Sequence, residues 1–347
     1  MKGFKDHDYV QTREDLFFCV VGYAHPPDRV LSYLKYVPSP HGKWGNGNKR
    51  FKRVLSYYTI PWLLETFQFL QKEYPQYLYD SYVLNIKMSA VPLSYLKTRY
   101  HPREKLSSLL GITKLDPLQQ NVVELVSLLS EESGIPLNSF GVTGSLLIDI
   151  HKPEFSDIDL TIHGLKNSEA LKETLLSLYK TGGTAITRFG KRVLEAWCKN
   201  KSTLYPITVE EAKTFYERKW NRGLYKDRQF SIHPIKLDEE IIEKYGDRVF
   251  IPQGIVEVEA TVSDATDAMF LPCTYNVNEV TVVAGRKVID IREVTTYEGL
   301  YADLAKVGEK ITVKGKLEKV LDKRTGEEHH RILVGSPEAV GTDFIRL

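Results

Sequence analysis

Cysteine is scarce in this chain of 347 residues, and long apolar runs are missing from it. Three cysteines, far apart and odd in number, predict neither a disulfide framework nor a zinc site. No apolar run approaches the roughly 20 residues that cross a bilayer. The first ten residues lack the apolar stretch of a secretion signal. We therefore expect reduced thiols, no membrane segment and a cytoplasmic location.

The composition is that of an ordinary globular protein. Hydrophobic residues make up 42% of the chain and charged residues 27%, which excludes a disordered, collagenous or low-complexity protein. The length is more than twice that of a typical domain and predicts two or three domains.

Charge is distributed unevenly behind a net value of +2. Residues 1–120 hold 17 Lys and Arg against 10 Asp and Glu, whereas residues 251–347 hold 12 against 16. A basic front of this kind suits an anionic partner such as nucleic acid, although solvated lysine faces are common. Twelve of the 20 tyrosines also lie in residues 1–120. Stacking on bases and burial in a small β domain explain them equally well.

The pattern of apolar residues predicts an α+β protein of three domains. Aromatic-rich strands and turns fill residues 15–59, and strands alone follow residue 250. Helices are predicted from Pro61 and over 102–110, 116–132, 168–180 (capped by Ser168) and 208–219. We therefore divide the chain into an N-terminal α+β domain (1–110), a central domain (111–249) and a C-terminal β domain (250–347). The last strands resemble a small barrel of the oligonucleotide-binding kind.

The most informative stretch is residues 141–164, GVTGSLLIDIHKPEFSDIDLTIHG. Gly144 and Ser145 open a short helix, where backbone N–H groups and a hydroxyl can meet an anion. Asp157 and Asp159 alternate along a strand and so project from one face of it. Paired carboxylates favour Mg²⁺ or Mn²⁺, which complete their shells with water and substrate phosphates. Together these features predict a site for a nucleoside triphosphate and its metal.

This motif resembles that of the nucleotidyltransferase superfamily of DNA polymerase β: Gly-Ser, a spacer of about a dozen residues, and Asp-x-Asp on a strand. Residues 21–38, 219–236 and 250–272 resemble an uncharacterised archaeal family of predicted nucleotidyltransferases. The resemblance implies a polymerase-β-like core, a mixed sheet with helices, between the two flanking domains. It also implies transfer of a nucleoside monophosphate to an acceptor hydroxyl. Its motif places metal and catalysis on Asp157 and Asp159, and the nucleotide on Gly144, Ser145 and Ser156.

One position departs from that pattern. Superfamily members that activate an acceptor hydroxyl carry a third carboxylate on a later strand, and the matching strand here puts Ser231 in its place. His233, on the same face, is a possible substitute as ligand or base. Glu257 or Glu259 would supply the carboxylate if the alignment is shifted. Without one, the aspartates would still hold the nucleotide's metal, but deprotonation of the acceptor would be weaker.

Residues 181–236 form a basic segment with 12 Lys and Arg against 5 Asp and Glu. Arg222 and Arg228 in this segment suit a triphosphate or a nucleic-acid backbone. The leading hypothesis is thus a Mg²⁺-dependent nucleotidyltransferase, with RNA, DNA, a protein or a small molecule as acceptor. The rival is a non-catalytic protein that keeps the fold and binds nucleotide or nucleic acid. The sequence does not specify an oligomeric state.

Overall fold

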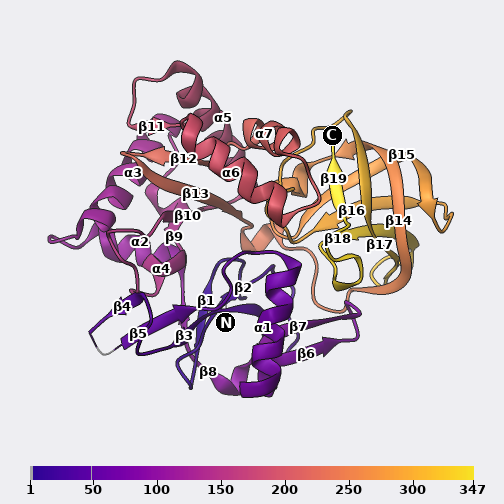
Figure 1. Cartoon of the computed structure of the whole chain (residues 1–347), viewed down its shortest axis with the longest axis horizontal. Coiled ribbons are helices and arrows are strands. Elements are labelled where there is room, and N and C mark those ends of the chain that lie inside the picture. Colours follow the sequence, from indigo (N-terminus) through magenta and orange to yellow (C-terminus); the bar gives the residue numbers. More distant parts are fainter. Residues whose placement is uncertain (1–2, 48) are drawn as a thin grey trace.

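Three sheets follow one another along the chain in a computed structural model that describes residues 3–47 and 49–347. Figure 1 shows the first sheet below, the second at the upper left with most of the helices, and the third at the right. This is the mixed α+β class that the sequence predicts. Within the described residues, no helix is long and apolar enough to cross a membrane.

The N-terminal sheet is antiparallel throughout and packs on both of its faces. One face packs around Tyr77 and around Leu70, which belongs to the helix α1 (Ile60–Glu73). This helix has Pro61 in its first turn, as expected. The other face packs on Leu147 and Ile150 of the central part. Its strands are β1 (Tyr9–Thr12), β2 (Phe17–Val20), β3 (Arg29–Pro38), β4 (Trp44–Asn46), β5 (Lys49–Arg53), β6 (Leu78–Ser81), β7 (Ile86–Pro92) and β8 (Leu96–Tyr100).

The central sheet has the order β11-β12-β13-β10-β9, in which only β10 and β13 run parallel. Helices α3 and α5 cover one face with the apolar side chains that form its core. The strands are β9 (Phe140–Val142), β10 (Ile158–His163), β11 (Ile186–Thr187), β12 (Arg222–Tyr225) and β13 (Arg228–Ile235). The helices are α2 (Pro102–Leu110), α3 (Pro117–Ser133), α4 (Gly144–Leu147), α5 (Leu165–Thr181), α6 (Lys191–Leu204) and α7 (Val209–Arg218).

Helix ends test the sequence predictions locally. Asp116 and Thr208 cap α3 and α7, each with a capping box. The prediction that the helix α5 begins at Ser168 is wrong. Helix α5 begins three residues earlier, after Gly164, and the buried Ser168 hydroxyl donates to the Gly164 carbonyl (2.7 Å). The hydroxyl thus bonds within the helix rather than capping it.

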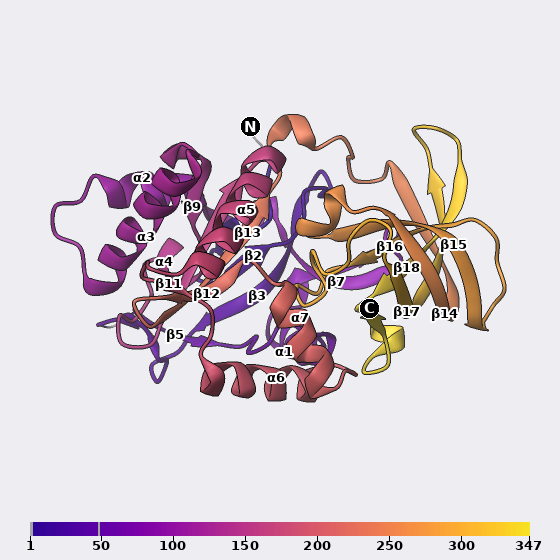
Figure 2. The same ribbon diagram turned by 90° about the horizontal axis from the view of Figure 1, so that it is seen from above.

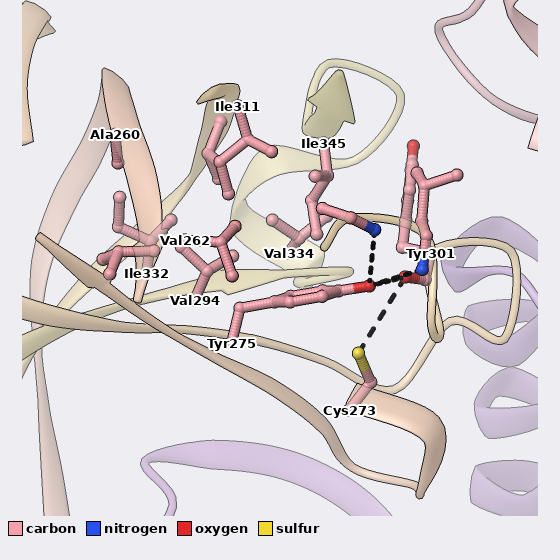
Figure 3. Close-up of a cluster of buried hydrophobic side chains, with 14 of the residues drawn as sticks. Ala260, Val262, Cys273, Tyr275, Val294, Tyr301, Ile311, Ile332, Val334 and Ile345 are labelled. Atoms are coloured by element: carbon pink, nitrogen blue, oxygen red, sulfur yellow. Dashed lines mark hydrogen bonds between the residues drawn. The ribbon is translucent and has the colours of Figure 1, made fainter. Parts of the chain in front are cut away.

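The C-terminal sheet has the order β14-β15-β16-β18-β17-β19, and β14 also pairs with β17. The path of paired strands from β14 through β17 therefore returns to β14, with β16 and β18 parallel. Its interior is apolar around Tyr275, whose hydroxyl donates to the Tyr301 carbonyl (2.6 Å) and accepts from the Leu304 amide (2.7 Å) (Figure 3). The strands are β14 (Arg248–Asp264), β15 (Cys273–Gly285), β16 (Ile291–Thr296), β17 (Lys310–Asp322), β18 (Glu328–Val334) and β19 (Phe344–Arg346).

Direct contacts join the three parts. Residues of α6 and α7 belong to the core of the C-terminal sheet, so these helices connect it to the central sheet. Figure 2 shows α6 and α7 on the same side of the molecule as α1. The Phe250 amide of β14 donates to the Val83 carbonyl (2.9 Å) of the N-terminal part. Short 3₁₀ turns complete the chain: η1 (Pro75–Tyr77), η2 (Leu93–Tyr95), η3 (Leu137–Ser139), η4 (Asp238–Glu240), η5 (Thr266–Met269) and η6 (Pro337–Ala339).

Candidate functional site

Asp157 and Asp159 lie at the beginning of β10, on the face of the central sheet opposite its helices. They alternate with Ile158 and Leu160, which are buried in the core beneath α3 and α5. Asp157 is exposed and Asp159 is half-buried. The strand therefore directs both carboxylates to the same side, as its alternation predicts.

The turn at Gly144 brings the beginning of α4 against Asp159. The Thr143 amide donates to the Asp159 carbonyl (2.9 Å), which fixes the turn to β10. Gly144 has a φ of +69°, and a Cβ on it would lie 2.4 Å from Oδ2 of Asp159. Both the backbone conformation and the close approach require glycine here. The structure thus brings Gly144 against Asp159, and the buried Ser145 follows it at the beginning of α4.

Replacing Gly144 by alanine should displace the Asp159 carboxylate. We expect a loss of about 2 kcal/mol in unfolding free energy from the left-handed backbone and the contact. Any activity that depends on Asp159 should fall by about a hundredfold. Gly134→Ala is the matched control, because Gly134 has the same φ of +69° but open space around its Cβ position. Equal losses of activity in the two variants, measured beside thermal unfolding, would contradict this account.

Ser156 has a structural role in the loop before Asp157. Its buried hydroxyl accepts a hydrogen bond from the Lys152 amide (2.9 Å) and closes the turn over residues 152–156. Arg228 supports the same loop by donating to the Pro153 carbonyl (2.7 Å). Two of the residues predicted to contact nucleotide therefore shape the loop that carries Asp157.

Ser231 lies beside Asp159 on the neighbouring parallel strand, where β10 and β13 pair in register. Its hydroxyl donates to Oδ1 of Asp159 (2.6 Å). Nε2 of His233 is 3.0 Å from the same hydroxyl, whose single proton is already engaged, so His233 is the donor in that bond. The position next to Asp159 thus holds a serine and a histidine. Among the described residues, no group of three or more Asp, Glu, His or Cys side chains is arranged to hold a metal.

His233 is neutral in this environment. Burial, together with the charges of Arg222 and Lys35, lowers the pKa of His233 to about 3. The ring of His7, which lies just before β1, covers it with a centroid distance of 3.8 Å. Burial, and then His233, also lowers the pKa of His7 well below its usual range. Neither ring is therefore a cation near neutral pH.

Glu257 and Glu259 lie in β14, in a different sheet from Asp159. They alternate there with Val256, Val258 and Ala260, which fill the interior of the C-terminal sheet. Their neighbours across β14 belong to β15 and β17. The strand pairings bring Ser231, and not these glutamates, next to Asp159.

The charges of three arginines act on Asp157. Burial, and then the charge of Asp159, raises the pKa of Asp157 to about 6, although Asp157 remains accessible to solvent. The charges of Arg222, Arg228 and Arg53 act in the opposite direction. Arg222 lies in β12 directly across from Ser231. Arg53 comes from the N-terminal sheet, and nothing in the sequence motifs indicates its place beside the aspartates.

A cavity of about 620 Å³ lies elsewhere, in the C-terminal sheet. It is lined by residues of the β15–β16 connection and of β17 and β18, among them Arg286, Lys319 and His330. The candidate site at the aspartates is a separate surface between the central and N-terminal sheets.

Comparison with known proteins places the chain in a family. No protein-family model matches it, and no solved structure matches it. The uncharacterised protein MJ1086 of Methanocaldococcus jannaschii is 30% identical to it over 344 residues, which is 98% of each chain. The chain belongs to the family of this archaeal protein. Because the match covers 98% of both chains, it extends over all three sheets and the candidate site. The name of the relative states no activity.

Proposed function

We propose that the protein is a Mg²⁺-dependent nucleotidyltransferase that moves a nucleoside monophosphate from a nucleoside triphosphate to an acceptor hydroxyl. One observation carries the proposal: the Gly144 turn packs on Asp159, which shares a strand face with Asp157. A phosphate-sized anion at the beginning of α4 would therefore lie next to two carboxylates. That juxtaposition is what metal-assisted phosphoryl chemistry requires.

The surrounding fold supports the same proposal. The mixed sheet flanked by α3 and α5 agrees with the polymerase-β-like core that the resemblance implies. The C-terminal sheet supports an oligonucleotide-binding barrel, since five of its strands form a closed path of pairings. A nucleic acid as acceptor is compatible with such a domain.

The residues at the site fit a magnesium ion. Asp157 and Asp159 would supply hard oxygen ligands on one face. Burial, and then the charge of Asp159, raises the pKa of Asp157, and a bound cation would offset both effects. When bound, Mg²⁺ would neutralise charge that develops on the transferred phosphoryl group and on pyrophosphate. Arg222 would contribute to the same neutralisation from β12.

In the reaction, the acceptor oxygen bonds to the α-phosphorus. At the same time the bond breaks between that phosphorus and the oxygen that bridges the α- and β-phosphates. Pyrophosphate leaves with the electron pair of the broken bond, and the hydroxyl proton passes to water. The position beside Asp159 holds Ser231, whose hydroxyl donates a hydrogen bond to Asp159 and is a poor acceptor for a proton. We therefore expect slow transfer, because no third carboxylate takes the hydroxyl proton.

The same serine favours a second candidate function. A protein that binds nucleotide or nucleic acid without catalysis needs the aspartates and the surrounding cations but no third carboxylate. Transfer of label from a nucleoside triphosphate to an acceptor distinguishes the enzyme from the non-catalytic binding protein. Nucleoside triphosphates labelled with ³²P at the α-phosphate should pass label to RNA, DNA or protein in the presence of Mg²⁺ or Mn²⁺. No transfer, together with metal-dependent nucleotide binding, would reject the enzyme and retain the binding protein.

Acid should weaken the metal-dependent part of nucleotide binding. Because the pKa of Asp157 is raised to about 6, protons compete with metal for this carboxylate below that pH. We expect about a tenfold loss of affinity for each pH unit below 6 and a plateau above 7. Titration calorimetry with ATP and Mg²⁺ at a series of pH values measures this change in affinity. Asp157→Asn should remove the pH dependence, and a dependence that persists in the variant would belong to another group.

A further inference from the structure

The N-terminal sheet directs a buried lysine, Lys35, toward the central sheet beside an irregularity in its strand pairing. Phe17 of β2 pairs with Tyr36 of β3, and the next residue, Phe18, pairs with Leu34. Lys35 is therefore an extra residue on β3, a β-bulge that interrupts the alternation of side chains. Lys35 faces the same side as Tyr33, two residues earlier, and the bulge brings Tyr36 to that side as well. This side faces the central sheet, and Nζ of Lys35 lies there 5.4 Å from the centroid of the Tyr9 ring.

This lysine has no anionic partner in the described part of the chain. Its side chain is 6% exposed and makes no hydrogen bond or ion pair there. Other largely covered lysines have a polar partner: Lys172 pairs with Asp303 (2.7 Å), and the more deeply buried Lys219 donates to the Gly299 carbonyl (3.1 Å). A buried, unpaired ammonium is costly, and a bound anion would offset that cost.

Aromatic rings hold the ammonium without neutralising its charge. Nζ of Lys35 lies 5.9 Å from the ring centroid of Tyr36 and 5.0 Å from that of Tyr58. The Tyr9 hydroxyl beneath them is buried and has no hydrogen-bond partner among the described residues. The rings explain how the lysine is tolerated, but its N–H donors and the Tyr9 hydroxyl remain available to a ligand.

Arg53 faces the same side from the adjacent strand. It pairs in register with Tyr36, and its Nε donates to the Leu55 carbonyl (2.7 Å). No ion pair of its guanidinium is formed within residues 3–47 and 49–347. Its charge lowers the pKa of Asp157, so it acts on the candidate site across the boundary between the sheets. Arg222 approaches the aspartates from the other side and also lacks an ion pair among these residues.

We infer that Lys35 and Arg53 bind phosphate groups of the substrate opposite Asp157 and Asp159, so that the N-terminal sheet forms half of the active site. The inference deepens the proposed function and rests on it for the identity of the substrate as a nucleotide. Four cations (Lys35, Arg53, Arg222, Arg228) and two carboxylates give a local charge of +2. One divalent cation would raise it to +4, which matches the roughly four negative charges of a nucleoside triphosphate near neutral pH.

The phosphates could belong to the triphosphate or to the backbone of a polynucleotide acceptor, so the test has two arms. One measures the equilibrium binding of inorganic tripolyphosphate without metal. The other measures that of a short single-stranded RNA. Full-length Lys35→Gln and Arg53→Gln are compared with Lys52→Gln, which removes the same charge from an exposed neighbour on the opposite face of β5. Thermal unfolding and Lys35→Arg, which keeps the charge, control for damage to the buried bulge.

We expect both glutamine variants to weaken binding about tenfold in one arm while Lys52→Gln leaves it unchanged. Weaker tripolyphosphate binding would assign the pair to the triphosphate, and weaker RNA binding alone would assign it to the acceptor. Unchanged affinity in both arms for a folded Arg53→Gln protein would overturn the inference. Neither arm requires turnover or metal. Phosphate binding by Lys35 and Arg53 is therefore tested independently of nucleotidyl transfer, and the failure of one can be told from the failure of the other.

Discussion

The variant Asp157→Asn with Asp159→Asn should lose nucleotidyl transfer by at least about a thousandfold, together with metal-dependent nucleotide binding. Asparagine keeps the shape of each side chain but removes the charge on which a hard cation depends. The fold should survive. Each carboxylate repels the other, and burial already disfavours the charge on Asp157. We expect the melting temperature to rise by about 2 °C at pH 7.5 without metal and to remain unchanged near pH 4.

The direction of this stability change follows from the pKa of Asp157. The folded carboxyl binds its proton more tightly than the unfolded one, so its contribution to stability falls as the pH rises from about 4 to about 6. Above that range the folded state carries the full cost of the charge. Asparagine removes the cost only where the aspartate is ionised. Because Asp157 is accessible to solvent, water screens part of this cost and keeps the expected rise to about 2 °C.

The control for this result is Glu257→Gln with Glu259→Gln. It removes the same two negative charges from the C-terminal sheet, where the residues alternate with Val256, Val258 and Ala260. Transfer and nucleotide binding should remain within about twofold of the unmodified protein. A large loss here would mean that β14 supplies the third carboxylate after all. Full activity of the double asparagine variant would reject the proposed metal site.

Ser231→Asp should increase Mg²⁺-dependent transfer by about a hundredfold. The substitution places a third carboxylate next to Asp159, on a strand that already pairs with β10 in register. It also exchanges a hydroxyl donor, 2.6 Å from Asp159, for a negative charge. Without metal the added repulsion should cost about 2 kcal/mol of unfolding free energy, and saturating Mg²⁺ should recover most of it.

Ser231→Asn is the matched control for that experiment, since it has the shape of aspartate without its charge. It should neither increase transfer nor make stability depend on Mg²⁺. Calorimetric unfolding with and without Mg²⁺ checks the metal linkage independently of any acceptor. If Ser231→Asp folds, gains stability from Mg²⁺ and still transfers no label, the protein is a nucleotide-binding protein whose acceptor site is lost. If it gains no stability from Mg²⁺, position 231 does not adjoin the metal.

The predictable part of the site is the part that is local in sequence. Gly144 and Asp159 are 15 residues apart, and turn, short helix and strand alternation bring them together. Ser231 is distant in sequence, but the resemblance to the superfamily pattern indicates its strand, and the structure pairs that strand in register with β10. The start of α5 could not be read in the same way. Ser168 has the chemistry of a cap, yet the chain enters the helix at Gly164.

The contribution of the N-terminal sheet could not have been predicted from the sequence. A strict alternation would place Lys35 and Tyr36 on opposite faces, and only the extra residue in β3 brings them to the same one. The position of Arg53 depends on which sheet its strand joins and on how that sheet packs against α4. The first depends on pairing between β3 and β5, and the second on contacts between segments about 100 residues apart, which no local pattern encodes.

The apolar contact between the first two sheets limits how this chain can be divided for study. Tyr9, Phe17 and Phe51 are buried against Leu147 and Ile150. A fragment that starts at residue 111 would present the last two side chains to water, beside the Gly144 turn. Such a fragment would tend to associate through this surface and would lack Lys35 and Arg53. Its inactivity would therefore report the missing strands and not the chemistry of the aspartates.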